Sequence, residues 1–310
     1  MPDKELKLQR AGMDTTRPVM LAIAGDSAAG KTTLTKGLVR ALGEDRVTAV
    51  CVDDYHRYDR TERKEKPFTP LHPDCNYMDI MAQHLQLLAT GQPILKPVYD
   101  HSSGELVRPE LVEPREFVII EGLLPLHSKL LRACFDVAVY LDPPEEIRIG
   151  WKLARDTSKR GYDEDAVRAE LERREPESEE HIRVQREYAD IVVRFAPVPG
   201  KDGPGTPLSA ELLLRPTIRH PDLSAVLTSS RSNAMHLKMI RDADGRPVDA
   251  LHVHGYVPRE DISPLEQAIW EELKLDLPLP EDLGDSGAGE RSEPLAITQL
   301  LLLRHMLKVG

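Results

Sequence analysis

The stretch VMLAIAGDSAAGKTT, residues 19–33, decides the fold of this 310-residue chain. It begins with an apolar segment of strand length and continues into residues 25–32, which fit the pattern GxxxxGK(S/T). In that pattern the glycines let successive backbone N–H groups surround phosphate oxygens. Leu34, Leu38 and Leu42 then recur at helical spacing. A strand, a glycine-rich turn and a helix in this order indicate a nucleotide-binding site.

The positions of this loop have distinct roles in binding a nucleotide. We expect Lys31 to reach the β- and γ-phosphates and the Thr32 hydroxyl to ligate Mg²⁺. The alternative is a glycine-rich turn that binds no nucleotide. The candidate nucleotide-binding residues are Gly25, Asp26, Ser27, Ala28, Ala29, Gly30, Lys31, Thr32 and Thr33.

Further apolar stretches of strand length alternate with helical patterns. This alternation predicts an α/β fold whose mostly parallel central sheet is flanked by helices. In such sheets ligands bind beyond the carboxyl ends of the strands, where this sequence places polar residues, so one shared site is expected. The predicted strands and the residues that follow them are 19–24 with Gly25, 47–52 with Asp53, 117–120 with Glu121, and 136–141 with Asp142.

The character of the chain changes after a Pro- and Gly-rich segment, residues 197–207, which we predict to be a linker or exposed loop. We expect a flexible N-terminus over residues 1–16 and a nucleotide-binding core over residues 17–198. Residues 208–310 are expected to supply strands and helices that extend the core into a mixed sheet; a small second domain is the alternative. An apolar helix is expected over residues 297–307.

Composition narrows the class of protein. The net charge is −11, which disfavours a nucleic-acid partner. No apolar run approaches the roughly 20 residues that a membrane-spanning helix needs. Three cysteines without CxxC spacing suggest neither a disulfide framework nor a zinc site. We therefore expect a cytoplasmic protein that binds a small molecule and neither a membrane nor nucleic acid.

A carboxylate at the second strand end is a candidate catalytic group. The glycine-rich pattern occurs in GTPase switches, motor ATPases and small-molecule kinases, and no NKxD-type segment for reading guanine is evident. Phosphoryl transfer to an alcohol requires a carboxylate near the attacking hydroxyl, a metal ion and cations around the transferred charge. Asp53 is the candidate general base and Glu121 a candidate Mg²⁺ ligand with Thr32. The alternatives are a turn aspartate and a hydrogen-bonded structural glutamate.

Basic residues form two clusters. Four of them, spaced as on one helical face, lie in and just after a helix expected over residues 145–156, and this face is either a lid over the phosphates or a solvated surface. A second cluster spans residues 56–66 directly after Asp53, where cations favour an acceptor that already carries phosphate; the alternative is a surface loop of mixed charge. The residues on the helix face are Arg148, Lys152, Arg155 and Lys159.

Five motifs stand in order along the chain: residues 25–33, 52–60 (VDDYHRYDR), 97–104 (PVYDHSSG), 118–125 (VIIEGLLP) and 155–161 (RDTSKRG). Together they resemble the phosphoribulokinase/uridine kinase family, and within it the phosphoribulokinases. The resemblance implies phosphorylation of ribulose 5-phosphate by ATP with Mg²⁺, giving ribulose 1,5-bisphosphate, and a homo-oligomer, dimeric or larger. A kinase of the same group that acts on uridine or another sugar, and a non-catalytic nucleotide-binding regulator, stay open.

The resemblance also implies roles for individual residues. Asp53 matches the catalytic base of the family, Asp156 a further acidic residue that is important for catalysis, and Glu121 the glutamate on the Mg²⁺ side. Arg155 joins the nucleotide-binding residues. The sequence departs from the family at Leu124, which stands where the motif EGLHP has histidine. The implied substrate contacts are His56, Arg60, Tyr99, His101, Lys152 and Arg160.

Overall fold

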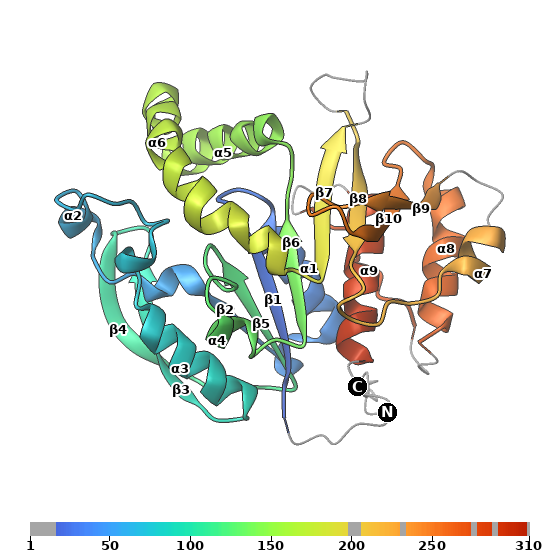
Figure 1. Ribbon diagram of the computed structural model, residues 1–310, viewed down its shortest axis with the longest axis horizontal. Helices are drawn as coiled ribbons and strands as arrows, with labels where there is room; N and C mark the ends of the chain where they lie inside the picture. Colours follow the sequence, from blue (N-terminus) through green and yellow to red (C-terminus); the bar gives the residue numbers. More distant parts are fainter. Residues whose placement is uncertain (1–16, 198–205, 230–233, 274–277, 287–290, 309–310) are drawn as a thin grey trace, which may run out of the picture. The chain divides into compact units, whose positions relative to one another are not determined.

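The computed structural model of the protein describes residues 17–197, 206–229, 234–273, 278–286 and 291–308 (Figure 1). The expected flexible N-terminus and most of the expected linker lie outside these residues. The chain divides into two compact units. Among the described residues, the first unit contains residues 17–35 and 45–192, and the second contains residues 36–44 and those from residue 193 onward.

The first unit is built around four parallel strands, as far as the described residues show. They are β2 (Val47–Cys51), β5 (Phe117–Gly122), β1 (Val19–Gly25) and β6 (Val137–Leu141), and they lie side by side in that order (Figure 1). Every residue of β1, β5 and β6 is buried, which explains their unbroken apolar sequences. The predicted α/β fold with a mostly parallel sheet is confirmed.

Helices flank these strands. The helix α1 (Lys31–Leu42) begins directly after the glycine-rich loop, and α3 (Met78–Ala89) buries its apolar face in the core. The helix α5 (Glu145–Arg160) runs further than the sequence pattern predicted and ends where Gly161 adopts a left-handed conformation. The remaining helices of this unit are α2 (Arg60–Arg63), α4 (Lys129–Arg132) and α6 (Glu164–Glu177), the last followed by a π-helical turn (Ser178–Ile182) and a 3-10 helix (Arg183–Tyr188).

An antiparallel hairpin in the first unit was not predicted. It consists of β3 (Ile94–Asp100) and β4 (Glu105–Val112), with an irregular register between Lys96 and Val98. The sequence conceals it because prolines interrupt both strands and β4 is exposed along almost its whole length, so no apolar alternation is present. The hairpin places residues 97–104 beside the segment that follows β2, because β3 packs against the turn Val52–Tyr55.

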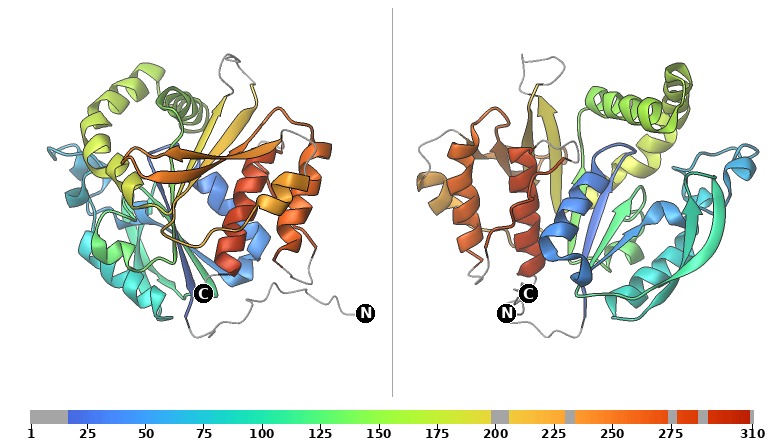
Figure 2. Two further views of the ribbon diagram at one scale, coloured as in Figure 1. Left: turned by 45° about the vertical axis from the view of Figure 1, so that its right-hand side comes forward. Right: turned by 180° about the vertical axis from the view of Figure 1, so that it is seen from behind.

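The second unit contains the antiparallel strands β8 (Leu208–Leu214), β10 (Pro247–Val253) and β9 (Met235–Arg241), in that order. The additional antiparallel strands are therefore confirmed, while their assignment to the same domain as the core stays a prediction. The predicted apolar helix is α9 (Glu293–Leu307), which is buried on nearly every side. The strand β7 (Ile191–Pro197) contains the division between the units. The other described helices of the second unit are α8 (Arg259–Glu271), which packs on α9 (Figure 2), and α7 (Ser224–Ser229), which packs on α8.

A close helix contact in the second unit involves a glycine of α1. A Cβ atom at Gly37 would lie 1.9 Å from Nε2 of Gln299, whose side chain is fully buried on α9. Gln299 Oε1 accepts a hydrogen bond from the backbone N–H of Gly284 at 2.7 Å. Only glycine therefore leaves room for this glutamine at the contact between α1 and α9. No helix within the described ranges is both long and apolar enough to cross a membrane.

Candidate active site

Two glycines of the loop between β1 and α1 adopt backbone conformations with a positive φ angle. Gly25 has a φ angle of +149° and Gly30 one of +98°, which residues with side chains rarely adopt. A Cβ atom at Gly25 would lie 2.8 Å from the carbonyl oxygen of Leu141. Lys31 Nζ donates hydrogen bonds to the carbonyl oxygens of Gly25 (2.9 Å) and Asp26 (2.8 Å). The ammonium group is thus held at the loop that would receive the phosphates.

Thr32 and Glu121 come together from α1 and β5. Thr32 Oγ1 donates a hydrogen bond to Glu121 Oε2 at 3.2 Å, although 89 residues separate them along the chain. Gly122 has a φ angle of +152°, and a Cβ atom there would lie 2.0 Å from Val52 Cγ2, so glycine lets the turn after β2 approach β5. Hydroxyl and carboxylate oxygens are the ligands that Mg²⁺ prefers. The pair therefore fits the predicted metal ligands.

The residue Asp53 follows β2 within the 3-10 turn Val52–Tyr55. Burial, and then the negative charges of Asp53 and Glu121, raise the pKa of the Cys51 thiol, so both carboxylates lie close to this cysteine. Asp142, which follows β6, forms an ion pair with Arg186 at 3.0 Å. Of the three acidic residues predicted at strand ends, Asp53 and Glu121 are therefore near one another. Asp142 is instead paired with an arginine of the 3-10 helix.

The basic face of α5 is directed at the glycine-rich loop. Arg148 and Lys152 are almost fully buried, each 4% exposed, so the alternative of a solvated face is wrong for them. Arg148 Nη1 donates to the carbonyl oxygen of Ser27 at 3.1 Å and lies 3.5 Å from Oδ1 of Asp26. Arg148 therefore holds the loop, a role that helical periodicity alone did not indicate. The side chains of Lys159 and Arg160 lie outside the described part of the structure.

Asp156 joins two cations on α5. Lys152 Nζ donates to Asp156 Oδ2 at 3.0 Å, and Arg155 Nε donates to Oδ1 at 2.8 Å. Burial raises the pKa of Asp156, but the hydrogen bonds and charges of Arg155 and Lys152 outweigh it and the net pKa is lowered. Desolvation lowers the pKa of Lys152. Arg155 Nη2 lies 3.5 Å from Ser27 Oγ, so this cluster also reaches the loop.

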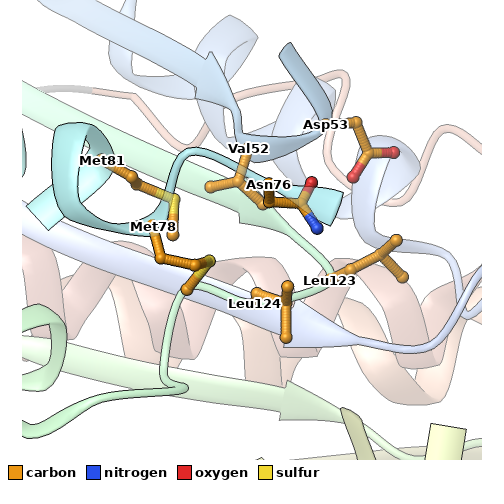
Figure 3. A pocket seen from close by; sticks show the side chains of 7 residues that line it. All are labelled: Val52, Asp53, Asn76, Met78, Met81, Leu123 and Leu124. Atoms are coloured by element: carbon orange, nitrogen blue, oxygen red, sulfur yellow. The ribbon is translucent and has the colours of Figure 1, made fainter. Parts of the chain in front are cut away.

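Asp53 and Asp54 have different surroundings, as expected for neighbouring residues. Asp54 bonds to the ammonium group of Lys96 and accepts a hydrogen bond from the backbone N–H of Tyr99 at 3.2 Å. Asp53 is half-buried and lines a pocket. Figure 3 shows its carboxylate with the amide of Asn76 among apolar side chains. The other lining residues are Val52, Met78, Met81, Leu123 and Leu124.

His56 is held as a neutral imidazole. Asn76 Nδ2 donates to the carbonyl oxygens of Pro70 (3.1 Å) and His72 (2.9 Å), so its Oδ1 faces His56 Nδ1 at 2.8 Å. His56 Nδ1 therefore carries the proton and Nε2 is an acceptor. Burial, despite the opposing charge of Asp53, lowers the pKa of His56 to about 4. The candidate substrate contact is thus a hydrogen-bonding group without charge at neutral pH.

The hairpin brings Tyr99 and His101 to His56. The ring of Tyr99 lies edge-on to both, with centroid distances of 4.9 Å to His56 and 5.0 Å to His101. Arg60 Nη2 donates to the carbonyl oxygen of His101 at 2.6 Å, and Arg63 bonds to the Tyr99 hydroxyl. The predicted contacts His56, Arg60, Tyr99 and His101 are therefore assembled. Arg63 and Asn76 were not selected from the sequence: Arg63 was one cation among several in its cluster, and Asn76 had no motif signal.

Leu124, the departure from the family motif, is buried and 2% exposed. It packs in an apolar cluster with Leu71, Leu123 and Ile182. A histidine at this position would meet apolar neighbours on this side of the Asp53 pocket. The substitution therefore replaces a polar group of the motif with part of an apolar wall.

Comparisons with known proteins point to one family of kinases. A family model described as "Phosphoribulokinase / Uridine kinase family" matches residues 20–199. The chain is 41% identical over 181 residues to a phosphoribulokinase from Synechocystis sp., covering 58% of this chain and 54% of that protein. It is 32% identical over 180 residues to a uridine kinase from Brevibacillus brevis, covering 57% of this chain and 84% of that protein.

A solved structure shares the fold. The phosphoribulokinase from Rhodobacter spheroides matches with a TM-score of 0.61 and 16% identity, covering 84% of this chain and 97% of that chain. The chain spans about half the length of two phosphoribulokinases that it matches in sequence, 54% and 56%. Because the family model covers more than half of the chain, the protein belongs to the phosphoribulokinase/uridine kinase family.

Proposed function

We propose that the protein transfers the γ-phosphoryl group of ATP to a hydroxyl group of ribulose 5-phosphate, giving ribulose 1,5-bisphosphate and ADP. The observation that carries this proposal is the surroundings of Asp53, which shares its pocket with Asn76. Asn76 in turn fixes His56, and the arginines of residues 60–63 lie on the following segment. A carboxylate followed shortly in the chain by cations suits an acceptor that has both a hydroxyl group and a phosphate.

In this mechanism Asp53 acts as the general base. Its carboxylate accepts the proton of the acceptor hydroxyl while the hydroxyl oxygen bonds to the γ-phosphorus and the bond from that phosphorus to the bridging oxygen of ADP breaks. Lys31 from the loop and Arg155 from α5 supply positive charge where negative charge accumulates. Lys152, held by Asp156, adds a further cation on the same helix.

The remaining predicted residues would bind Mg²⁺ and the acceptor. Thr32 and Glu121 would hold Mg²⁺, which when bound neutralises charge on the β- and γ-phosphates. His56 Nε2 can accept a hydrogen bond from an acceptor hydroxyl. Arg60 is held by the His101 carbonyl through one nitrogen, and its other N–H groups can bind the acceptor phosphate.

A uridine kinase activity is the second candidate function. It is favoured by the long alignment with the Brevibacillus brevis uridine kinase. It is also favoured by the apolar wall at Leu124, which suits a base better than a sugar phosphate. We still place ribulose 5-phosphate first, because the identity to the Synechocystis phosphoribulokinase is higher and arginines lie close to the predicted acceptor contacts.

The test is ADP release with Mg-ATP and, in parallel, ribulose 5-phosphate, uridine or no acceptor. Turnover with ribulose 5-phosphate alone supports the proposal. Turnover with uridine instead would establish the second candidate. Nucleotide binding without turnover of any acceptor in a wider panel of sugars and sugar phosphates would identify a non-catalytic nucleotide-binding regulator.

A further inference from the structure

The helix α6 changes its hydrogen-bonding pattern at its C-terminal end. It contains Pro176 and stops at Glu177, and a π-helical turn begins at Ser178. Turns of this kind are rare in helices, and those that occur are often found at functional sites. Here the two adjacent residues bond to different parts of the proposed site: Ser178 to the nucleotide loop and Glu177 to the segment on the acceptor side.

Ser178 bonds to the nucleotide loop. Its hydroxyl donates to Oδ2 of Asp26, and the two residues are 2% and 6% exposed. The other oxygen of Asp26 accepts from the backbone N–H of Ser27 at 2.6 Å and lies 3.5 Å from Arg148 Nη1. The backbone carbonyl of Asp26 also holds Lys31 at 2.8 Å. Ser178 therefore fixes a loop residue that itself positions the phosphate-binding lysine.

Glu177 bonds to the acceptor side. Its carboxylate accepts from the backbone N–H of Thr69 at 2.9 and 3.0 Å and from the Thr69 hydroxyl. The next residue, Pro70, supplies a carbonyl that accepts from Asn76 Nδ2, and Asn76 orients His56. Glu177 therefore supports the segment that sets the tautomer and position of the proposed acceptor contact.

We propose that Glu177 and Ser178 are positioning residues, Ser178 for the nucleotide and Glu177 for the acceptor. This inference rests on the proposed function for its acceptor half. Neither residue carries any part of the phosphoryl transfer. The bonds that they make span 152 residues to Asp26 and 108 residues to Thr69, and burial of Asp26, Ser178 and Thr69 shields these bonds from water.

The experiment compares Ser178→Ala, Ser178→Thr and Glu177→Ala with a matched control, Glu175→Ala. Glu175 lies on the same helix but bonds to Arg183, at 2.7 Å. A hydrogen bond to a charged group is worth about 1.5–3 kcal/mol, and only the part of it that holds Asp26 for ATP enters the KM. Ser178→Ala should therefore raise the KM for ATP by about threefold to tenfold and change the KM for the acceptor by less than about twofold. Glu177→Ala should raise the KM for the acceptor and change the KM for ATP by less than about twofold. Ser178→Thr, which keeps the hydroxyl group, should restore the KM for ATP. Glu175→Ala should change neither KM value.

Binding of a non-hydrolysable ATP analogue, measured by calorimetry, separates this inference from the proposed function. If the wild type turns over no acceptor, the proposed function fails, but Ser178→Ala must still weaken analogue binding while Glu177→Ala must not. In the Asp26→Ala background, Ser178→Ala should have no further effect on analogue binding if Ser178 acts only through its bond to Asp26. Equal effects of Ser178→Ala and Glu177→Ala on both substrates, or no effect of either, would overturn the inference. Circular dichroism melts confirm that each variant is folded.

Discussion

Lys152 and Asp156 form a buried ion pair on α5, with 3.0 Å between Nζ and Oδ2 and exposures of 4% and 3%. One helical turn separates them, so the helix itself sets their spacing. Removing water from two charges costs much, and the pair is tolerable only because each charge faces the other. Arg155 adds a second cation to the same carboxylate at 2.8 Å. Asp156 thus keeps two cations of the proposed nucleotide site in place.

Loss of this carboxylate should therefore be costly. We predict that Asp156→Ala lowers the free energy of unfolding by about 3–5 kcal/mol, because it leaves Lys152 buried without its partner. Urea denaturation measures this. The control is Glu164→Ala, which removes an exposed pair with Arg168, 2.7 Å apart, and should cost at most about 1 kcal/mol. Equal losses for the two variants would show that burial does not matter here.

The pH dependence of stability should reflect His56. Its pKa is lowered from 6.5 to about 4 in the folded protein, so the folded state binds fewer protons than the unfolded state between these values. The contribution of His56 to the free energy of unfolding is therefore fully present above about pH 6.5. It is lost as the pH falls toward 4, and the loss is about 3 kcal/mol at most. The groups around the ring are Asp53, Arg63, Asn76 and His101.

Replacing His56 should remove this part of the pH dependence. Urea denaturation at pH 7.5 and pH 5 should give a smaller difference for His56→Gln than for the wild type. His101→Gln should change the difference much less, because His101 is exposed and its charge is the smallest of the effects on the His56 pKa. A wild-type-like difference in His56→Gln would contradict the assignment of a lowered pKa to this residue.

A pair of helical glycines tests the packing of α1 on α9. Gly37→Ala would place Cβ 1.9 Å from Gln299 Nε2, and we predict a loss of about 1–3 kcal/mol in the free energy of unfolding. Gly150 on α5 has no atom within 4 Å of a Cβ built there, so Gly150→Ala should stabilise by about 0.5–1 kcal/mol. Thermal melts of the two variants should shift in opposite directions, and a shift in the same direction would contradict the described contact.

Local signals in the sequence were sufficient for much of the fold. The glycine-rich loop joins a strand to a helix in a fixed pattern, and β1, β5 and β6 are buried along their whole length. These features depend on residues close in sequence, so the sheet edge and the candidates Asp53 and Glu121 could be found without the structure. Thr32 and Glu121 then prove to lie 3.2 Å apart.

Other features depend on contacts between distant residues. Helical periodicity placed Arg148 on a face with Lys152, but only the structure shows that Arg148 is buried and bonds to the Ser27 carbonyl instead of forming part of a solvated surface. The bond from Ser178 to Asp26 joins residues 152 positions apart, and no motif marks it. The hairpin β3–β4 was missed because its strands lack apolar alternation, although it delivers Tyr99 and His101 to the site.

The most direct test of the proposed function is the rate constant of Asp53→Asn with Mg-ATP and ribulose 5-phosphate, measured with nucleotide affinity in the same samples. Asparagine has a similar shape but cannot accept the proton of the attacking hydroxyl. We predict that kcat falls by about 10²–10⁴-fold while affinity for a non-hydrolysable ATP analogue stays within about twofold of the wild type. A variant that keeps kcat within about threefold of the wild type would contradict the role of Asp53 as general base.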